Sequence, residues 1–323
     1  MIAEITWIHW TVFVLAVILF LALDLGVFHR KVHSVKFKEA LLWTAIWFTL
    51  AMGFAWGLYV LRGQEQALEF FTGYIVELSL SMDNVFVIAL IFGYFRVPLA
   101  YQHRVLFWGI MGALIMRGIM IWAGAALVRE FDWTLMIFGG FLVFSGIKLL
   151  FTREESVEPG KNILMRLAKK FLPISPSFDQ HRFITIINGR RMLTPLFLVL
   201  IMVETTDLIF ALDSIPAIFG ITTNEFIVFT SNVFAILGLR SLYFVLAGAI
   251  EYFRFLKFGL SLVLVFIGAK MLLLKFIHIS TPVSLGIIGT IILASIGVSL
   301  VSRWMQVRRQ LKRKEISGMG VDG

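Results

Sequence analysis

The chain has 323 residues, of which 59% are apolar and only 15% are charged, whereas an ordinary soluble domain carries about 25% charged residues. Together with a mean hydropathy of +0.90, this excludes a soluble enzyme, a disulfide-rich secreted domain and a disordered protein. It predicts an all-α polytopic membrane protein. The net charge of +9 is expected to reflect basic cytoplasmic loops, so no nucleic-acid partner is expected.

Nine apolar segments are long enough to cross a bilayer as helices. A transmembrane helix needs about 20 mostly apolar residues, and each segment is close to that length. The predicted spans are residues 10–28, 41–61, 70–95, 104–127, 132–152, 193–219, 226–250, 256–275 and 283–302. The protein is therefore expected to contain about nine transmembrane helices.

The distribution of basic residues predicts the orientation of these spans. With the N-terminus outside, the inner segments hold 22 of the 29 Lys and Arg residues, and the outer loops hold three. Cytoplasmic loops of membrane proteins are enriched in Lys and Arg. We therefore expect the N-terminus outside and the C-terminus in the cytoplasm. Because Arg30 and Lys31 follow the first span instead of preceding it, that span is not expected to be a cleaved signal peptide.

The spans and loops divide the chain into five segments. They are residues 1–69 with two N-terminal transmembrane helices, 70–152 with a first three-helix repeat, 153–192 as a basic cytoplasmic loop, 193–275 with a second, inverted three-helix repeat, and 276–323 with the final transmembrane helix and a basic cytoplasmic tail. Within the loop, residues 162–172 have the pattern of an amphipathic helix at the membrane interface. Residues 183–191 have that of a hairpin around an Asn188-Gly189 turn.

The evidence for a repeat is that the third to fifth spans resemble the sixth to eighth. Glu77 stands six residues before Asp83, as Asp207 stands before Asp213, and a small polar residue follows the second acid in each case. The match continues through the next two spans of each half. Because the third span is expected to enter from outside and the sixth from inside, the two repeats are inverted. This arrangement occurs in many secondary transporters, with the site near the midplane.

Ten charged residues fall within the predicted spans, where each costs at least about 2.5–3.5 kcal/mol on insertion scales. They are Asp24, Glu77, Asp83, Arg117, Lys148, Glu204, Asp207, Asp213, Arg240 and Lys270. We expect the two lysines to extend toward the membrane surfaces, and Asp24 to be either a peripheral gate acid or a partner of Arg30. The other five acids outnumber the two arginines by about three charges, so they require a bound cation or protons.

Oxygen-bearing side chains accompany these acids and predict a site for a hard divalent cation. Carboxylate, amide and hydroxyl oxygens suit Mn²⁺, Ca²⁺ or Mg²⁺. The chain has no cysteine, and its six histidines lie outside the acidic group, which argues against a zinc site. The predicted metal ligands are Glu77, Asp83, Asn84, Glu204, Asp207, Asp213, Ser214 and Asn232, with Asp24, Arg117 and Arg240 as supporting charges.

Helical geometry supports a single site only in part. Glu77 and Asn84 share one stripe of a helix, whereas Asp83 lies about 120° away from Glu77. The equivalent residues of the sixth span have the same relation. A single site therefore requires a broad face or a broken helix, and Pro216 offers a break. The alternative is that the buried acids and arginines form an ion-pair network that only holds the helices together.

Four stretches of sequence resemble the TerC family of integral membrane proteins, in particular its Alx-like branch. They are ALDLGVFHR at 22–30, ELSLSMDNVF at 77–86, ETTDLIFALDSIPAIF at 204–219 and TSNVFAILGLR at 230–240. The resemblance extends over residues 10–305. It implies a bacterial inner-membrane protein, an association with tellurium resistance by name and, for the Alx-like branch, Mn²⁺ export. It also implies a distant relation to LysE-like exporters, which share inverted three-helix halves.

Two hypotheses for the function follow. The first is a secondary transporter that exports a divalent cation, Mn²⁺ before Ca²⁺, by alternating access, with protons as the candidate counter-ion. The alternative is a membrane scaffold or stress-response protein, associated with tellurium resistance, whose buried charges are structural. The spans contain no His-Glu-x-x-His motif, so no enzyme activity and no resident cofactor are expected. The expected partners are lipid and the transported ion.

Overall fold

The computed structural model contains long helices and one β-hairpin, and it describes residues 6–23, 37–131, 133–151, 173–187, 189–246, 256–274, 276–277 and 279–318. In these ranges the helices are α1 (Trp7–Leu23), α2 (Phe37–Arg62), α3 (Gln64–Tyr94), α4 (Leu99–Glu130), α5 (Thr134–Phe151), α7 (Pro195–Phe219), α8 (Glu225–Leu246), α9 (Leu256–Leu272) and α10 (Thr281–Gly318). The strands are β1 (Ile184–Ile187) and β2 (Arg190–Leu193). The predicted all-α fold class is confirmed.

Each predicted span overlaps one of these helices. Seven helices of the described ranges are long and apolar enough to cross a membrane: α2, α3, α4, α5, α7, α8 and the first part of α10. α1 and α9 have 17 residues each, which is the lower limit for a transmembrane helix. A polytopic membrane protein is therefore supported, and the total of nine spans remains a prediction.

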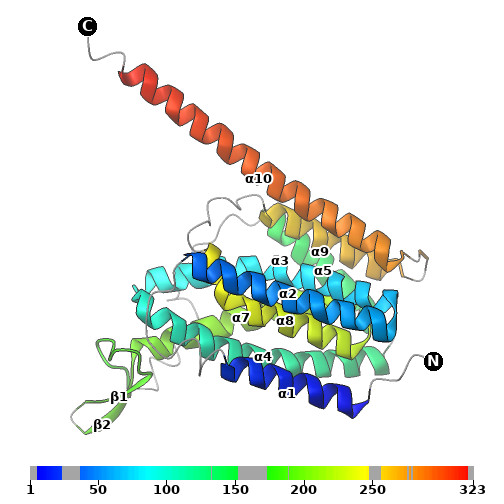
Figure 1. Ribbon diagram of the computed structural model, residues 1–323, viewed down its shortest axis with the longest axis horizontal. Helices are drawn as coiled ribbons and strands as arrows, with labels where there is room; N and C mark the ends of the chain where they lie inside the picture. Colours follow the sequence, from blue (N-terminus) through cyan, green and yellow to red (C-terminus); the bar gives the residue numbers. More distant parts are fainter. Residues whose placement is uncertain are drawn as a thin grey trace.

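Four helices form the centre of the bundle, and the others cover them (Figure 1). α3 packs against α8 and α7, while α4 packs against α7 and α8. α2 covers α3 and α8. α5 and α9 form a closely packed pair, and α10 lies against α9 and α3. α8 is almost entirely buried, so its polar side chains face protein and not lipid.

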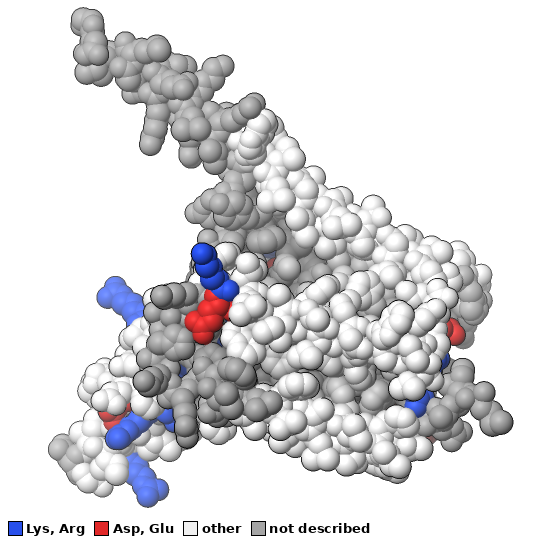
Figure 2. All heavy atoms as spheres, viewed as in Figure 1, with Lys and Arg blue, Asp and Glu red and all other residues white. Residues whose placement is uncertain are grey.

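The outer surface of the bundle is apolar. Large apolar side chains are exposed on several helices, including Trp56 on α2, Trp122 on α4 and Phe144 on α5. Figure 2 shows a broad uncharged band across the helices, with charged side chains gathered toward the ends of the bundle. A soluble monomer rarely exposes so extensive an apolar surface. Contact with lipid accounts for it, in agreement with a membrane protein.

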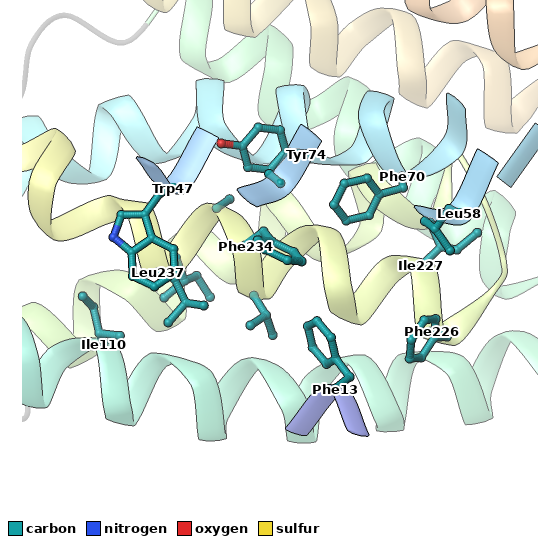
Figure 3. Close-up of a cluster of buried hydrophobic side chains, with 14 of the residues drawn as sticks. Phe13, Trp47, Leu58, Phe70, Tyr74, Ile110, Phe226, Ile227, Phe234 and Leu237 are labelled. Carbon is teal, nitrogen blue, oxygen red and sulfur yellow. The ribbon is translucent and has the colours of Figure 1, made fainter. Parts of the chain in front are cut away.

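Aromatic side chains fill the core between α1, α2, α3 and α8 (Figure 3). The Phe70 and Phe234 rings meet edge to face with their centroids 5.7 Å apart. The Phe13 and Phe226 centroids are 5.9 Å apart in a similar geometry. Because such pairs stabilise a fold beyond the area that they bury, this cluster holds the two N-terminal helices against the central ones.

Glycines bring the backbones of α5 and α9 into contact. A β-carbon at Gly268 would overlap the carbonyl group of Gly139, and a β-carbon at Gly139 would overlap that of Gly268. Gly146 lies in the same way against the backbone of Ser261, whose hydroxyl donates a hydrogen bond to the Gly146 carbonyl. Small residues allow helices to approach this closely in membranes. The two helices therefore touch at two places.

The β-hairpin projects from one end of the bundle (Figure 1). Its strands are antiparallel, with Ile187 opposite Arg190. Gly189 has φ +74°, as a two-residue type I′ turn requires. The predicted hairpin is confirmed, and Asn188 lies outside the described residues. The predicted amphipathic helix at 162–172 lies outside the described residues.

The last helix continues beyond its apolar part. The predicted span ends at residue 302, whereas α10 continues to Gly318 and leaves the bundle (Figure 1). Backbone hydrogen bonds maintain a helix whatever its side chains face, so the apolar run defined the membrane-spanning part and not the end of the helix. α1 begins at one end of the bundle, and α10 finishes beyond the other (Figure 1).

Candidate functional site

A buried arginine lies at the centre of the bundle. Arg117, in the middle of α4, is only 2% exposed. Its guanidinium contacts side chains of α3, α7 and α8. Removal of a charge from water costs several kcal/mol, so this position depends on partners of opposite charge.

Two carboxylates bind this guanidinium. Arg117 Nη2 donates to Asp207 Oδ1 at 2.9 Å, and Nε donates to Oδ2 at 3.2 Å. Arg117 Nη1 forms an ion pair with the Glu77 carboxylate. Asn84 Nδ2 also donates to Asp207 Oδ1, at 3.4 Å. The two-pronged contact with Asp207 is among the strongest hydrogen-bonded arrangements in proteins.

Neutral side chains complete the arrangement. Arg117 Nη1 also donates to Asn232 Oδ1 at 2.9 Å and to Ser214 Oγ at 3.3 Å. Asn232 Nδ2 in turn donates to Glu77 Oε2 at 3.3 Å, so this amide bridges the acid and the base. We call the following six residues the Arg117 cluster: Glu77, Asn84, Arg117, Asp207, Ser214 and Asn232.

Helical spacing explains how two of the helices supply this cluster. Glu77 and Asn84 are seven residues apart on α3, as are Asp207 and Ser214 on α7. Seven residues are nearly two full turns, so both members of each pair lie on one face of the helix. The two stripes expected from the sequence therefore exist and meet at Arg117.

Oxygen atoms around the cluster remain without a donor. Ser81 Oγ, Asn84 Oδ1 and Glu204 Oε2 are buried and have no hydrogen-bond partner among the residues described. Folded proteins leave few such atoms unsatisfied. The side chains of Ser81 and Asn84 belong to the buried interior, so this region can accept further hydrogen bonds or bind a cation.

Glu204 lies at the edge of the cluster. It precedes Asp207 by almost one turn on α7 and interacts with it electrostatically. Its carboxylate lies against α4 at Gly112, where a β-carbon would overlap it. The lack of a side chain at Gly112 thus makes room for a third acid beside α4, five residues before Arg117.

Asp83 and Asp213 do not join the cluster. Asp213 accepts a hydrogen bond from the side chain of Ser145 on α5, and Asp83 interacts electrostatically with Lys257 on α9. α3 and α7 are continuous helices, and α7 passes through Pro216 without ending there. The helix break considered above is therefore not observed, and the 120° offset directs these two acids toward α9 and α5.

The eight predicted ligands are thus divided. Five lie in the Arg117 cluster, Glu204 lies at its edge, and Asp83 and Asp213 lie apart. In the described ranges no three Asp, Glu or His side chains are close enough to hold a metal ion. Arg240 is buried farther along α8, and Asp24 lies outside the described residues.

Other hydroxyl groups that lie near the acids in the sequence form hydrogen bonds within their own helices. Ser79 donates to the carbonyl of Ile75 at 2.7 Å, and Thr205 donates to that of Ile201 at 2.6 Å. Such bonds to the preceding turn are common for Ser and Thr in helices. These side chains therefore do not contribute to the Arg117 cluster.

A cavity of about 980 Å³ lies at the end of the bundle where α3 begins and α7 ends. Thr222 Oγ1 donates to Glu69 Oε2 at 2.8 Å, and Lys270 interacts with Glu69 electrostatically. Glu69 is not among the predicted site residues because it precedes the predicted third span. The spacing of four residues from Glu69 to Gly73, and from Gly73 to Glu77, was the available signal.

Comparison with known sequences identifies the family. Residues 62–310 match the Integral membrane protein TerC family. The chain belongs to the TerC family. The part that matches TerC contains the whole Arg117 cluster and Glu69, and the resemblance expected from the four sequence stretches is confirmed.

Relatives of this TerC protein come from several bacteria. An uncharacterized membrane protein of Myxococcus xanthus, STKORF319, is 54% identical over 292 residues, which is 90% of this chain and 92% of the relative. An Escherichia coli K12 protein described as a candidate membrane-bound redox modulator, Alx, is 44% identical, with 94% and 97% covered. An uncharacterized membrane protein of Rickettsia bellii is 39% identical, with 91% and 97% covered. No solved structure matches the chain.

Proposed function

We propose that the protein is a secondary transporter that exports a divalent metal cation, Mn²⁺ before Ca²⁺, across the bacterial inner membrane. The observation that carries the proposal is the Arg117 cluster. Carboxylate, amide and hydroxyl oxygens from α3, α7 and α8 meet there at the centre of a membrane bundle. Buried ionisable groups in membrane segments commonly mark the routes of ions and protons.

Helix packing supports two inverted three-helix repeats, α3–α4–α5 and α7–α8–α9. The contact of α3 with α8 and that of α4 with α7 are equivalent when the two repeats are exchanged. The close contacts of α5 and α9 show the same symmetry. When the two helices are exchanged, the contact of Gly139 with Gly268 becomes the contact of Ser261 with Gly146. The order of residues is opposite in the two helices, which are therefore antiparallel. Such repeats are the basis of alternating access in many transporters.

The donor set favours a hard cation. The proposed central ligands are Glu77, Asn84, Asp207, Ser214 and Asn232, with Glu204 at the edge. All offer oxygen, which suits Mn²⁺ and Ca²⁺. Asp83 and Asp213, which face α9 and α5, belong in this proposal to the route of the ion and not to its central site. Protons are the proposed counter-ion.

The positions of the basic residues support an orientation with the C-terminus in the cytoplasm. The hairpin strand β2 carries Arg190 and Arg191 and lies at the end of the bundle where α10 leaves it (Figures 1 and 2). Basic segments favour the cytoplasmic side. The cavity beside Glu69 then faces outward and is proposed as the exit for the cation.

The alternative is a scaffold or stress-response protein whose buried charges are structural. The relative named Alx is described as a candidate redox modulator. The present chain contains no cysteine, so thiol chemistry is not available to it. Transport and scaffolding differ in one measurable respect, because only a transporter requires its buried acids to interact with metal.

Glu77→Gln and Asp207→Asn are expected to reduce Mn²⁺ transport about tenfold or more, because a hydrogen bond to a charged group contributes about 1.5–3 kcal/mol. The measurement is Mn²⁺ uptake into inside-out membrane vesicles. Glu225→Gln is the matched control, since this exposed acid pairs with Arg129 at the surface. Wild-type uptake in both buried variants would refute the proposal. A loss of abundance and thermal stability without any response to metal would favour the scaffold.

Glu69→Gln is expected to reduce Mn²⁺ flux severalfold and to leave the thermal stabilisation by Mn²⁺ unchanged. Glu69 lines the cavity and does not contact the Arg117 cluster, so it affects passage and not central binding. Glu65→Gln tests an exposed acid of the same cavity. Loss of stabilisation by Mn²⁺ in the Glu69 variant would instead make Glu69 part of the binding site.

A further inference from the structure

The oxygens that we assign to the cation are bound to Arg117 in this conformation. All three nitrogens of the guanidinium donate to the cluster. We propose that Arg117 is an internal counter-ion that exchanges with the transported cation. It binds Glu77 and Asp207 when the carrier is empty, and it moves to Glu204 when a divalent cation binds. This inference rests on the proposed function.

The charges of the site require such an exchange. Glu77 and Asp207 are 0% and 8% exposed, and two carboxylates at this depth are very costly without a positive partner. A carrier that releases its cation must therefore neutralise them before it returns. A guanidinium attached to α4 binds both at once, because its planar donors fit carboxylate oxygens, and it offsets one of their two negative charges. It also stays with the carrier after release.

Arg117 and a divalent cation exclude each other from these oxygens. Nη1 of Arg117 donates hydrogen bonds to the Glu77 carboxylate, Asn232 Oδ1 and Ser214 Oγ. In the proposed function a metal ion would bind these same oxygen atoms. Two positive charges within a few ångströms also repel strongly in a medium of low dielectric constant. Binding of the cation thus requires that the guanidinium leave.

Glu204 can receive the displaced guanidinium. Its Oε2 is buried without a hydrogen-bond partner in the described structure. Its carboxylate lies against α4 at Gly112, five residues before Arg117. Long side chains on a helix lean toward its N-terminus, so Arg117 can reorient along α4 toward this carboxylate. Glu204 is in this respect a positioning residue, since it acts on the site through Arg117.

Loss of Arg117 should affect Mn²⁺ exchange and net Mn²⁺ transport differently. Loss of a merely structural arginine would reduce both equally. Exchange of Mn²⁺ for Mn²⁺ does not require the empty carrier to return across the membrane, whereas net transport requires that return in every cycle. In Arg117→Gln, measured in proteoliposomes, we expect exchange to continue and net flux to fall about tenfold or more, because the empty carrier then lacks the positive charge beside Glu77 and Asp207. Arg117→Lys, which keeps the charge without the two-pronged geometry, should retain part of the net flux.

Binding provides a second readout. Because Arg117 competes with the cation, its removal should raise the apparent affinity for Mn²⁺ about tenfold, as expected if the competent state is populated about one tenth of the time in the wild type. Mn²⁺ should then stabilise Arg117→Gln against heat more than it stabilises the wild type. Glu204→Gln should weaken Mn²⁺ binding, and this effect should disappear when Arg117 is also replaced by Gln, because no guanidinium then needs a second carboxylate.

The outcomes distinguish this inference from the proposed function. Absence of Mn²⁺ flux in the wild type would remove both. Transport by the wild type, combined with equal losses of exchange and net flux in Arg117→Gln, would overturn only the counter-ion. Net flux in Arg117→Gln at the wild-type rate would overturn it as well. Unchanged Mn²⁺ affinity in Glu204→Gln would refute the assignment of Glu204.

Discussion

Arg117→Met is expected to lower the free energy of unfolding by about 3–5 kcal/mol, the range for removal of one partner from a buried ion pair. Methionine retains an apolar side chain but leaves Glu77 and Asp207 without their shared positive charge. Asn232 and Ser214 also lose the donor that they share. Thermal unfolding of the purified protein in detergent and metal-free buffer measures the effect.

A compensated variant tests whether charge is the cause. Arg117→Met combined with Glu77→Gln and Asp207→Asn removes all three charges with little change of shape, so it should recover most of the lost stability. Arg129→Met is the surface control, because Arg129 is 66% exposed in its pair with Glu225 and such pairs contribute about 0–1 kcal/mol. A triple variant less stable than the single one would contradict this explanation.

Gly268→Ala is expected to destabilise the protein by about 1–3 kcal/mol, the usual cost of overpacking. The new methyl group would meet the Gly139 carbonyl at 2.6 Å and the Val143 backbone nitrogen at 2.8 Å. These are backbone atoms that cannot move aside without shifting α5. The contact between α5 and α9 should therefore open. The same variant should also impair transport if the two helices must stay paired during the cycle.

Gly140→Ala is the matched control for this prediction. Gly140 is adjacent to Gly139 on α5, but a β-carbon there meets no atom within 4 Å. Alanine also has a higher helix propensity than glycine, so no loss of stability is expected. Thermal unfolding of both variants decides the matter. Equal stability of Gly268→Ala and the wild type would show that α5 and α9 do not depend on this contact.

Much of the fold and part of the site could be predicted from local patterns. The apolar runs located the helices because a segment in lipid must be apolar along about 20 residues. The interval of seven residues located Glu77 with Asn84, and Asp207 with Ser214, because an unbroken helix repeats its direction after two turns. The Asn188-Gly189 pair predicted the hairpin through the positive φ that its turn requires.

The composition of the site could not be predicted in this way. Asp83 and Asp213 lie in the same apolar spans as the other acids, so the sequence pattern predicts that they share one site. The helices remain continuous, however, and direct these acids toward α9 and α5. Periodicity describes directions around the axis of one helix, but it does not say which helix lies opposite. The same limit concealed the place of Glu69 beside Thr222.

Composition and periodicity by themselves determined that this is a membrane protein of apolar helices with acids buried in two of them. Only the tertiary structure decided that Arg117 stands between Glu77 and Asp207. The physical reason is that burial in lipid acts on each segment separately, whereas charge neutralisation is a property of the space between helices. The excess of acid in the sequence therefore becomes, in the folded protein, a site whose oxygens already hold a positive charge.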